Sequence, residues 1–208
     1  MDIITDQTPG QGRQPRGGRD TRQRLIEAAR EVFADRGYHA ASLSEIASRA
    51  GLTTGAVYST FGSKKALLIA AVTDGSGEDG DLGAMLAAAA SLREGLEHLA
   101  LDAARNGLDP ASLRLIKLQV EVLKLGLDEP EVLAGVAAVG RQQLDAAEKA
   151  LTGKAERDGV PLPMPARDLV TLLSALLNGL HLMQLVDPSV VNEDHFLSGV
   201  RALLGWER

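Results

Sequence analysis

The chain has 208 residues, 45% of them hydrophobic and 24% charged, which is enough apolar material for a real core. Cysteine is absent, which excludes a disulfide framework, a thiolate nucleophile and a thiolate metal site. The N-terminus is polar, and no apolar run free of breaks and polar residues is long enough to span a membrane. We therefore expect a soluble cytoplasmic protein.

The net charge of −6 is distributed unevenly. Residues 13–72 contain ten Lys and Arg against five Asp and Glu, whereas residues 73–208 contain twelve against twenty-one. The first segment therefore carries +5 and the second carries −9. A basic end is typical of a nucleic-acid contact, and an acidic remainder discourages non-specific contact.

Residues 1–19 are rich in Gly, Pro, Gln and Arg, so we expect a disordered N-terminal arm. Its arginines, Arg13, Arg16 and Arg19, could reach a minor groove, although such a tail is more often simply mobile. The first helix is expected to begin at Asp20 as N-cap and to run to about Arg36, before Gly37.

Residues 42–65 predict two short helices joined by a tight turn, followed at once by the start of a third helix. Ser42 and Glu45 have the spacing of a capping box. Gly51 lies where the first helix must end and the chain must turn. With Thr53 as the cap of the second helix, the segment predicts a helix-turn-helix, which places its second helix in the major groove of DNA.

The polar face of that second helix carries small hydroxyls, a glycine and a phenol, which can approach phosphates and base edges closely. Ser63 then caps the next helix, whose first residues are Lys64 and Lys65. A DNA phosphate bound at this helix terminus would make the two cations favourable. The alternative is a solvated lysine pair on an ordinary helical hairpin.

The pattern of residues 43–64 resembles the DNA-binding domain of TetR-family transcriptional regulators, over residues 20–70 approximately. It is carried by Leu43, Ile46, Ala47, Ala50, Gly51, Leu52, Thr53, Gly55, Val57, Tyr58, Phe61, Ser63 and Lys64. Two positions depart from the family. Thr60 stands where histidine or tyrosine is usual, and Lys65 stands where an acidic residue is common.

The resemblance implies a set of DNA-binding residues: Ser44, Thr53, Thr54, Gly55, Ala56, Tyr58, Ser59, Thr60, Lys64 and Lys65. Of these, Thr53, Tyr58, Thr60 and Lys64 would contact phosphates, and Thr54, Gly55 and Ala56 would lie near base edges. The phosphate contact at Thr60 is open because of the departure from the family.

Every strong pattern from Leu82 onward is helical, so the fold class is all-α. We expect an N-terminal three-helix helix-turn-helix head in residues 20–72 and a C-terminal helical ligand-binding and dimerisation bundle in residues 82–208. Between them, the run from Gly75 to Gly80 has the spelling of a dinucleotide fingerprint. No strand precedes it and its acidic residues would repel a pyrophosphate, so we interpret it as a hinge.

The stretch from Leu169 to Val186 carries leucines around most of its circumference. A helix that is apolar on nearly all sides must be buried on nearly all sides, and a second copy of the chain is the readiest cover. The resemblance agrees, because in this family the last two helices usually pair with their symmetry mates. The alternative is a central core helix in a monomer.

The resemblance also implies a pocket for a small effector in the body. Polar residues that interrupt apolar faces are its candidate lining: His98, Lys117, Gln119, Glu121, Asn178, His181 and Gln184. We favour Asn178, His181 and Gln184, which share two turns of the most apolar helix, with Gln119 beside them. Since aromatic residues make up only 3% of the chain, we expect a flexible, largely apolar effector.

No metal site and no cofactor are expected, because the four histidines are far apart in sequence. No nucleophile motif, metal cluster or phosphate loop supports an enzyme. The sequence therefore predicts a ligand-responsive regulator, expected to be a repressor, that binds a palindromic operator as a homodimer and is released by its effector. Two alternatives stay open: a regulator that needs its ligand as co-repressor, and a protein-interaction adaptor without DNA binding.

Overall fold

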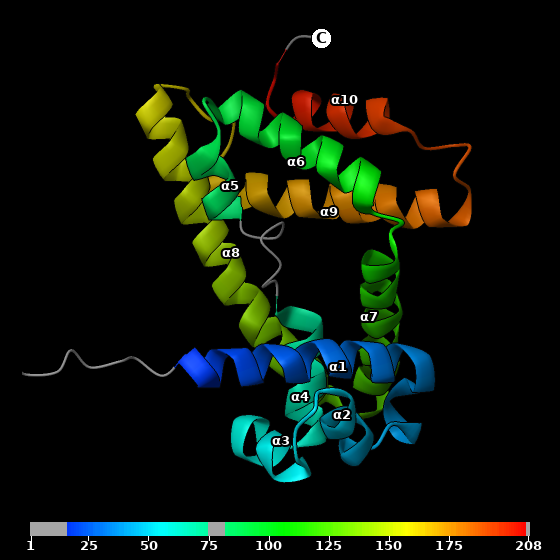
Figure 1. Cartoon of the computed structure of the whole chain (residues 1–208). Helices are drawn as coiled ribbons and strands as arrows, with labels where there is room; N and C mark the ends of the chain where they lie inside the picture. The colour runs from blue at the N-terminus through cyan, green and yellow to red at the C-terminus, as the bar shows by residue number, and fades with distance from the viewer. Residues whose placement is uncertain (1–15, 75–81, 207–208) are drawn as a thin grey trace, which may run out of the picture.

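The computed structural model describes residues 16–74 and 82–206, which fold into ten α-helices without a β-strand (Figure 1). The all-α prediction is confirmed. The helices are α1 (Arg16–Ala40), α2 (Leu43–Arg49), α3 (Thr54–Phe61), α4 (Lys64–Thr73), α5 (Leu82–Ala88), α6 (Leu92–Asn106), α7 (Pro110–Asp128), α8 (Pro130–Asp158), α9 (Ala166–Val186) and α10 (Glu193–Leu203). Figure 1 shows α1 to α4 at one end of the molecule and α6, α9 and α10 at the other, joined by α7 and α8.

Helix α1 starts earlier than its sequence predicts. Residues 16–19, expected in the N-terminal arm, form its first turn, and Arg13 lies outside the described residues. Asp20, the expected N-cap, lies inside the helix with its carboxylate 3.6 Å from Arg24. The predicted break at Gly37 is confirmed, since Gly37 has φ +75° and interrupts the helical backbone before Ala40.

Three of the four N-caps predicted for the head are confirmed by hydrogen bonds, and Asp20 is the exception. The hydroxyls of Ser42, Thr53 and Ser63 each accept from the backbone N–H three residues ahead, at 3.1, 3.3 and 3.0 Å. Each bond satisfies one amide that the helix start leaves unpaired. The caps therefore fix where α2, α3 and α4 begin.

The hydrophobic core of the head continues into the body. Phe33 of α1 and Leu68 of α4 are fully buried in one cluster with Leu118 of α7 and Val132 of α8. The far end of α4 is also tied to α1, where the Arg30 guanidinium donates to the Ala71 carbonyl at 2.8 Å. Because close-packed interiors transmit displacements, a shift of α7 would also displace the helices of the head that pack against it.

A second core fills the body between α5, α6, α8, α9 and α10, with Leu96, Leu151 and Phe196 fully buried. Helix α5 ends at Ala88, and Ser91 caps the start of α6. Lys154 of α8 is buried, and its ammonium donates to the Ala89 carbonyl at 2.8 Å. This lysine holds the turn between α5 and α6 against α8.

Helix α9 is less buried within one chain than its composition predicts. Only Leu169, Val170 and Leu173 are buried on it. Its uncovered large apolar side chains are 41–86% exposed: Leu172, Leu182, Met183, Leu185 and Val186. Length and a mean hydropathy of 1.7 would allow α9 to cross a membrane, although the core helix of a soluble protein can have the same length and composition.

Candidate functional site

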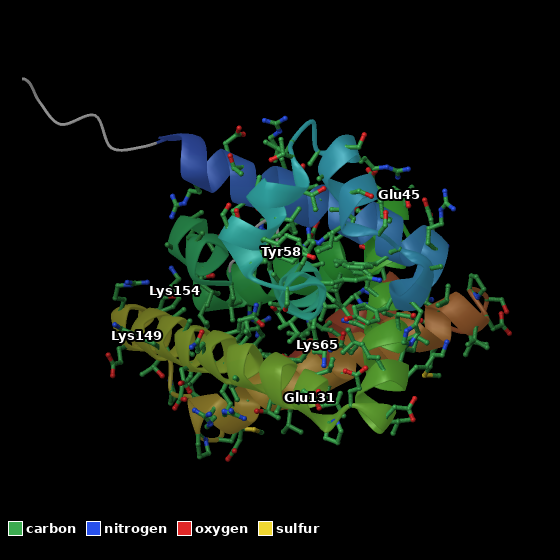
Figure 2. All side chains as sticks on the ribbon, turned by 90° about the horizontal axis from the view of Figure 1, so that it is seen from below. Glu45, Tyr58, Lys65, Glu131, Lys149 and Lys154 are labelled. Carbon is green, nitrogen blue, oxygen red and sulfur yellow. The ribbon has the colours of Figure 1, made fainter. Side chains whose placement is uncertain are left out.

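The first candidate surface is formed by α2, the following turn and α3. Gly51 adopts φ +65°, a left-handed conformation that a residue without Cβ reaches at little cost, and it lets α3 cross α2. Val57 on the inner face of α3 is fully buried, whereas Tyr58 beside it is 56% exposed. Figure 2, viewed from this end of the molecule, shows Tyr58 on the outward side of α3. The short helix therefore presents one face to solvent.

The residues expected to contact DNA mostly share this face. Exposed side chains or backbone are found at Ser44, Thr53, Gly55, Tyr58, Ser59 and Thr60, and half-buried ones at Thr54 and Ala56. The hydroxyls of Ser59 and Thr60 both donate to the Ala56 carbonyl, at 3.1 and 2.7 Å. Donation to a phosphate from either residue thus requires rotation of its side chain.

Lys64 follows the cap of α4 and lies over the Tyr38 ring, with its Nζ atom 4.6 Å from the ring centroid. The same Nζ atom donates to the His39 carbonyl at 3.4 Å. Partial burial lowers the pKa of Lys64 from its ordinary value. These contacts hold the ammonium beside the junction of α1 and α2.

Lys65 is engaged differently from its neighbour. Its Nζ atom forms ion pairs with Glu129, which joins α7 to α8, and with Glu131 of α8 at 2.8 Å. Figure 2 shows Lys65 and Glu131 next to each other. Hydrogen bonds to the two carboxylates raise the pKa of Lys65, and the lysine in turn lowers the pKa of Glu131. Lys65 thereby links head and body, a role that the sequence did not indicate.

A second link between head and body was also missed from the sequence. The Glu121 carboxylate of α7 accepts a hydrogen bond from the backbone N–H of Tyr38 at 2.7 Å. Glu121 was a candidate for the pocket, but its side chain faces α1 instead. The extended turn after Gly37 exposes the Tyr38 amide to this acceptor, and sequence spacing cannot reveal such a partner 83 residues away.

The second candidate site is a cavity of about 490 Å³ among α4, α7, α8 and α9. Helix α7 supplies the largest share of the wall: Ser112, Leu115, Ile116, Gln119, Val122 and Leu123. Helices α8 and α4 add Leu133, Val136 and Val72, while α9 adds Asn178, His181 and Leu182. The cavity lies within the range typical of small-molecule sites.

Three of the four favoured pocket residues line this cavity: Gln119, Asn178 and His181. The fourth, Gln184, does not. Its amide nitrogen donates to the Ala104 carbonyl at 3.4 Å, and its Oε1 atom is buried without a hydrogen-bond partner in the described part of the chain. His98 belongs to a separate depression between α5 and α6, and Lys117 is absent from the wall.

His181 is fixed by its surroundings. Its Nε2 atom lies 2.6 Å from the Ala103 carbonyl, and its ring centroid lies 5.3 Å from that of Phe196. Space for the imidazole depends on Gly107, because a Cβ atom there would lie 2.3 Å from His181 Cδ2. In the described residues no three His, Cys, Asp or Glu side chains gather as a metal site would require.

Comparison with known proteins matches residues 25–71 to the family model described as bacterial regulatory proteins, tetR family. The transcriptional activator FasR of Mycolicibacterium smegmatis is 51% identical over 51 residues, which cover 24% of this chain and 23% of FasR. The matched segment therefore spans only about a quarter of this curated relative. The segment matched by the family model, residues 25–71, lies within α1 to α4.

Solved structures extend the likeness to the whole fold. A TetR-family regulator from Rhodococcus sp. superposes with a TM-score of 0.72 at 17% identity, covering 89% of this chain and 99% of that one. The regulator FadR of Bacillus subtilis, solved with stearoyl-CoA, gives a TM-score of 0.64 at 20% identity, covering 89% and 99%. Residues 25–71 thus match the DNA-binding domain of the tetR family, and the described chain as a whole has the fold of TetR-family regulators.

Proposed function

We propose that the chain is a ligand-responsive transcriptional repressor that binds a palindromic operator as a homodimer and leaves it when a small effector fills the cavity. The observation that carries the proposal is α3, a capped helix with a buried inner face and an uncovered outer face of small polar residues. This is the geometry that a major groove accepts.

In the proposed complex, α3 lies in the major groove with its first turn toward the base edges. Thr54, Gly55 and Ala56 approach the bases, while Tyr58 and Lys64 contact phosphates with Thr53, Thr60 and Ser44 nearby. Gly55 has no side chain, so the backbone of α3 can approach the DNA closely there. Packing within the protein does not require this glycine, because an added Cβ atom would meet only the Thr53 hydroxyl, at 3.7 Å. Lys65 is kept from the phosphates as long as Glu129 and Glu131 hold it.

The proposed dimer forms through α9 and α10, so that two heads meet two half-sites. The support is the uncovered apolar face of α9, which includes Val186 at 86% exposure and Leu182 and Met183 at 52%. Contiguous apolar surface of this kind marks an interface. In the proposed dimer the partner's α9 covers this face, and residues 82–206 serve as the ligand-binding and dimerisation unit.

Effector binding is proposed to reach the head through α7 and α4, because each helix touches both regions. Helix α7 carries cavity residues such as Ile116 and also Glu121, which holds the Tyr38 amide. Helix α4 carries Val72 at the cavity and Lys65 at the Glu129–Glu131 link. A ligand that displaces either helix therefore changes the tilt of the head, and two heads that move apart no longer fit one operator.

In the alternative, the ligand strengthens operator binding instead of releasing the protein. The same cavity and helices α4 and α7 would then act with the ligand as a co-repressor that sets the distance between the two heads for DNA. FasR, which matches this chain over 51 residues, is named an activator. An adaptor without DNA binding is the remaining alternative. It is disfavoured by the uncovered outer face of α3.

Fluorescence anisotropy tests the proposal with a duplex from the region beside the chain's own gene and a scrambled duplex of equal length, at two salt concentrations. We expect tight, salt-sensitive binding that prefers the native duplex and weakens in both Tyr58→Ala and Lys64→Ala. Lys149→Ala is the matched control, because Lys149 is an exposed lysine of α8 outside the proposed interface. Tyr58→Phe keeps the aromatic ring and removes the hydroxyl, so it distinguishes the contribution of the hydroxyl to DNA affinity from that of the ring. Equal affinity for both duplexes, together with no loss in the variants, would contradict operator binding.

A further inference from the structure

The cavity wall is free of formal charge. Among the described residues that line it, none is Asp, Glu, Lys or Arg, and its polar members are Ser112, Gln119, Asn178 and His181. Arg114 and Lys117 belong to α7, but neither lines the wall. An ionised ligand group would therefore lose water there without gaining an opposite charge from the described wall.

The polar residues of the wall are concentrated toward one end, with Gln119 nearer its middle. Helix α7 begins close to α9, because Gly107, just before α7, lies against His181 (Figure 1). Ser112 lies in the first turn of α7, and Asn178 and His181 stand one turn apart on α9. Val122, ten residues further along α7, is grouped with Leu133 and Val136 of α8 and with Val72 of α4. Ten helical residues rise about 15 Å, so the cavity is long as well as polarised.

The hydrogen bond of His181 defines what its ring can offer a ligand. A carbonyl oxygen only accepts, so the Nε2 atom carries the proton that the Ala103 carbonyl receives. In the neutral imidazole, Nδ1 is then an acceptor for a hydroxyl or an amide N–H. Asn178 one turn earlier supplies both amide donors and an acceptor.

We propose that the effector is an uncharged amphiphile, with a hydroxyl or amide group at the Asn178–His181 end and an apolar chain that extends along α7 to Val72 of α4. This inference rests on the proposed ligand-responsive function and specifies its ligand class. A volume of about 490 Å³ holds about 16 non-hydrogen atoms at the ~30 Å³ that a water molecule occupies in the liquid.

The proposal separates this chain from its structural relative FadR, whose ligand, stearoyl-CoA, is anionic and much larger. Burying an ionised carboxylate or ammonium without a partner is strongly unfavourable, whereas burying a hydroxyl is tolerable once it is hydrogen-bonded. The wall satisfies the second condition but not the first.

The test compares three probes with the same ten-carbon chain: decanol, decanoate and decylammonium. Binding to the full-length chain is measured by isothermal titration calorimetry at pH 7 and by the shift of the thermal unfolding midpoint, below the concentration at which any probe forms micelles. We expect saturable decanol binding, with each charged probe bound at least about tenfold more weakly. Equal or tighter binding of either ion, or no binding of decanol, would overturn the proposal.

Variants locate the binding. Ile116→Trp fills the middle of the cavity and should abolish decanol binding, while Leu127→Trp, at an 82% exposed position of the same helix, should leave it unchanged. Asn178→Leu should weaken decanol about fivefold, the loss of one hydrogen bond. Undiminished binding in Ile116→Trp would place decanol elsewhere and overturn the inference.

The ligand assay tests the proposed ligand class and the DNA assay tests the proposed function, so either proposal can be refuted without the other. The probe ranking is measured without DNA, so a lack of operator preference would contradict the proposed function and leave the ranking intact. Conversely, preference for an ion would refute only the ligand class.

Discussion

The hairpin of α7 and α8 depends on Gly126, and replacing it with alanine is a direct test of the packing beneath the cavity. A Cβ atom at this position would lie 2.3 Å from Leu133 Cγ and 2.6 Å from Leu133 Cδ2. Because Cγ is near the root of the side chain, Leu133 cannot avoid the methyl group by rotating its end. Overpacking of this kind destabilises by about 1–3 kcal/mol. Alanine recovers up to about 1 kcal/mol in a helix, so a clash in the middle of that range, about 2 kcal/mol, leaves a net loss of about 1–2 kcal/mol.

Chemical denaturation followed by circular dichroism measures this loss for Gly126→Ala. The double variant Gly126→Ala/Leu133→Ala shows whether the clash is the cause. With the leucine side chain removed, the same alanine should stabilise by about 0.5–1 kcal/mol relative to Leu133→Ala alone. Gly140→Ala on α8 is the matched control, because a Cβ atom added at Gly140 would have no neighbour within 4 Å, and it should stabilise by a similar amount. The reasoning is refuted if Gly126→Ala is as stable as the wild type, or if its loss persists without Leu133.

Three further predictions concern single side chains. Lys65→Met should lower the thermal unfolding midpoint at pH 7, because it removes the ion pair with Glu131 that lowers the pKa of this carboxyl group. The ion pair stabilises the fold only while the carboxylate is ionised, so the difference in midpoint from wild type should shrink as the pH falls below about 4.3. A difference that stays constant down to acid pH would exclude the ion pair. Lys154→Met should reduce the free energy of unfolding by about 3 kcal/mol in denaturant titrations, because it removes the buried ammonium that pairs with the half-buried Asp158 carboxylate at 3.3 Å and that donates to the Ala89 carbonyl. A change within error would mean that the lysine is dispensable. Val186→Glu should convert a dimer into a monomer in size-exclusion chromatography with light scattering, whereas Leu127→Glu, similarly exposed but on α7, should stay dimeric; identical masses for both variants would argue against pairing through α9.

Local sequence signals predicted the helix-turn-helix well, because its determinants are close in the chain. Ser42, Thr53 and Ser63 cap helices through amides three residues ahead, and Gly51 makes a turn that only its own backbone determines. The start of α1 was mispredicted for the opposite reason. Asp20 has the chemistry of a cap, but the helix continues through the glycines before it and Asp20 pairs with Arg24 instead.

The cavity was only partly predictable. Asn178 and His181 share a face of α9 by helical spacing, so the sequence could place them together. Val72 and Leu133 come from distant helices, and only the fold brings them to the same wall. Glu121 was expected at the pocket, yet it accepts a hydrogen bond from the Tyr38 amide, which the bend at Gly37 in α1 leaves outside the helical pattern. Long-range partners of this kind leave no periodic trace in one sequence.

Helix α9 has two working sides in the proposed dimer. His181 lies against the cavity, while Val186, just over one turn later, lies on the surface that the partner would cover. A ligand that turns or slides α9 in one subunit therefore presses on α9 of the other, next to the second cavity. The two ligand sites should then be thermodynamically coupled, so that the first molecule bound changes the affinity for the second. The ligand-binding curve would be sigmoidal if the coupling is positive and flattened if it is negative. The sensitivity of the regulator to effector concentration would then depend on the packing of α9 against α9 in the subunit interface.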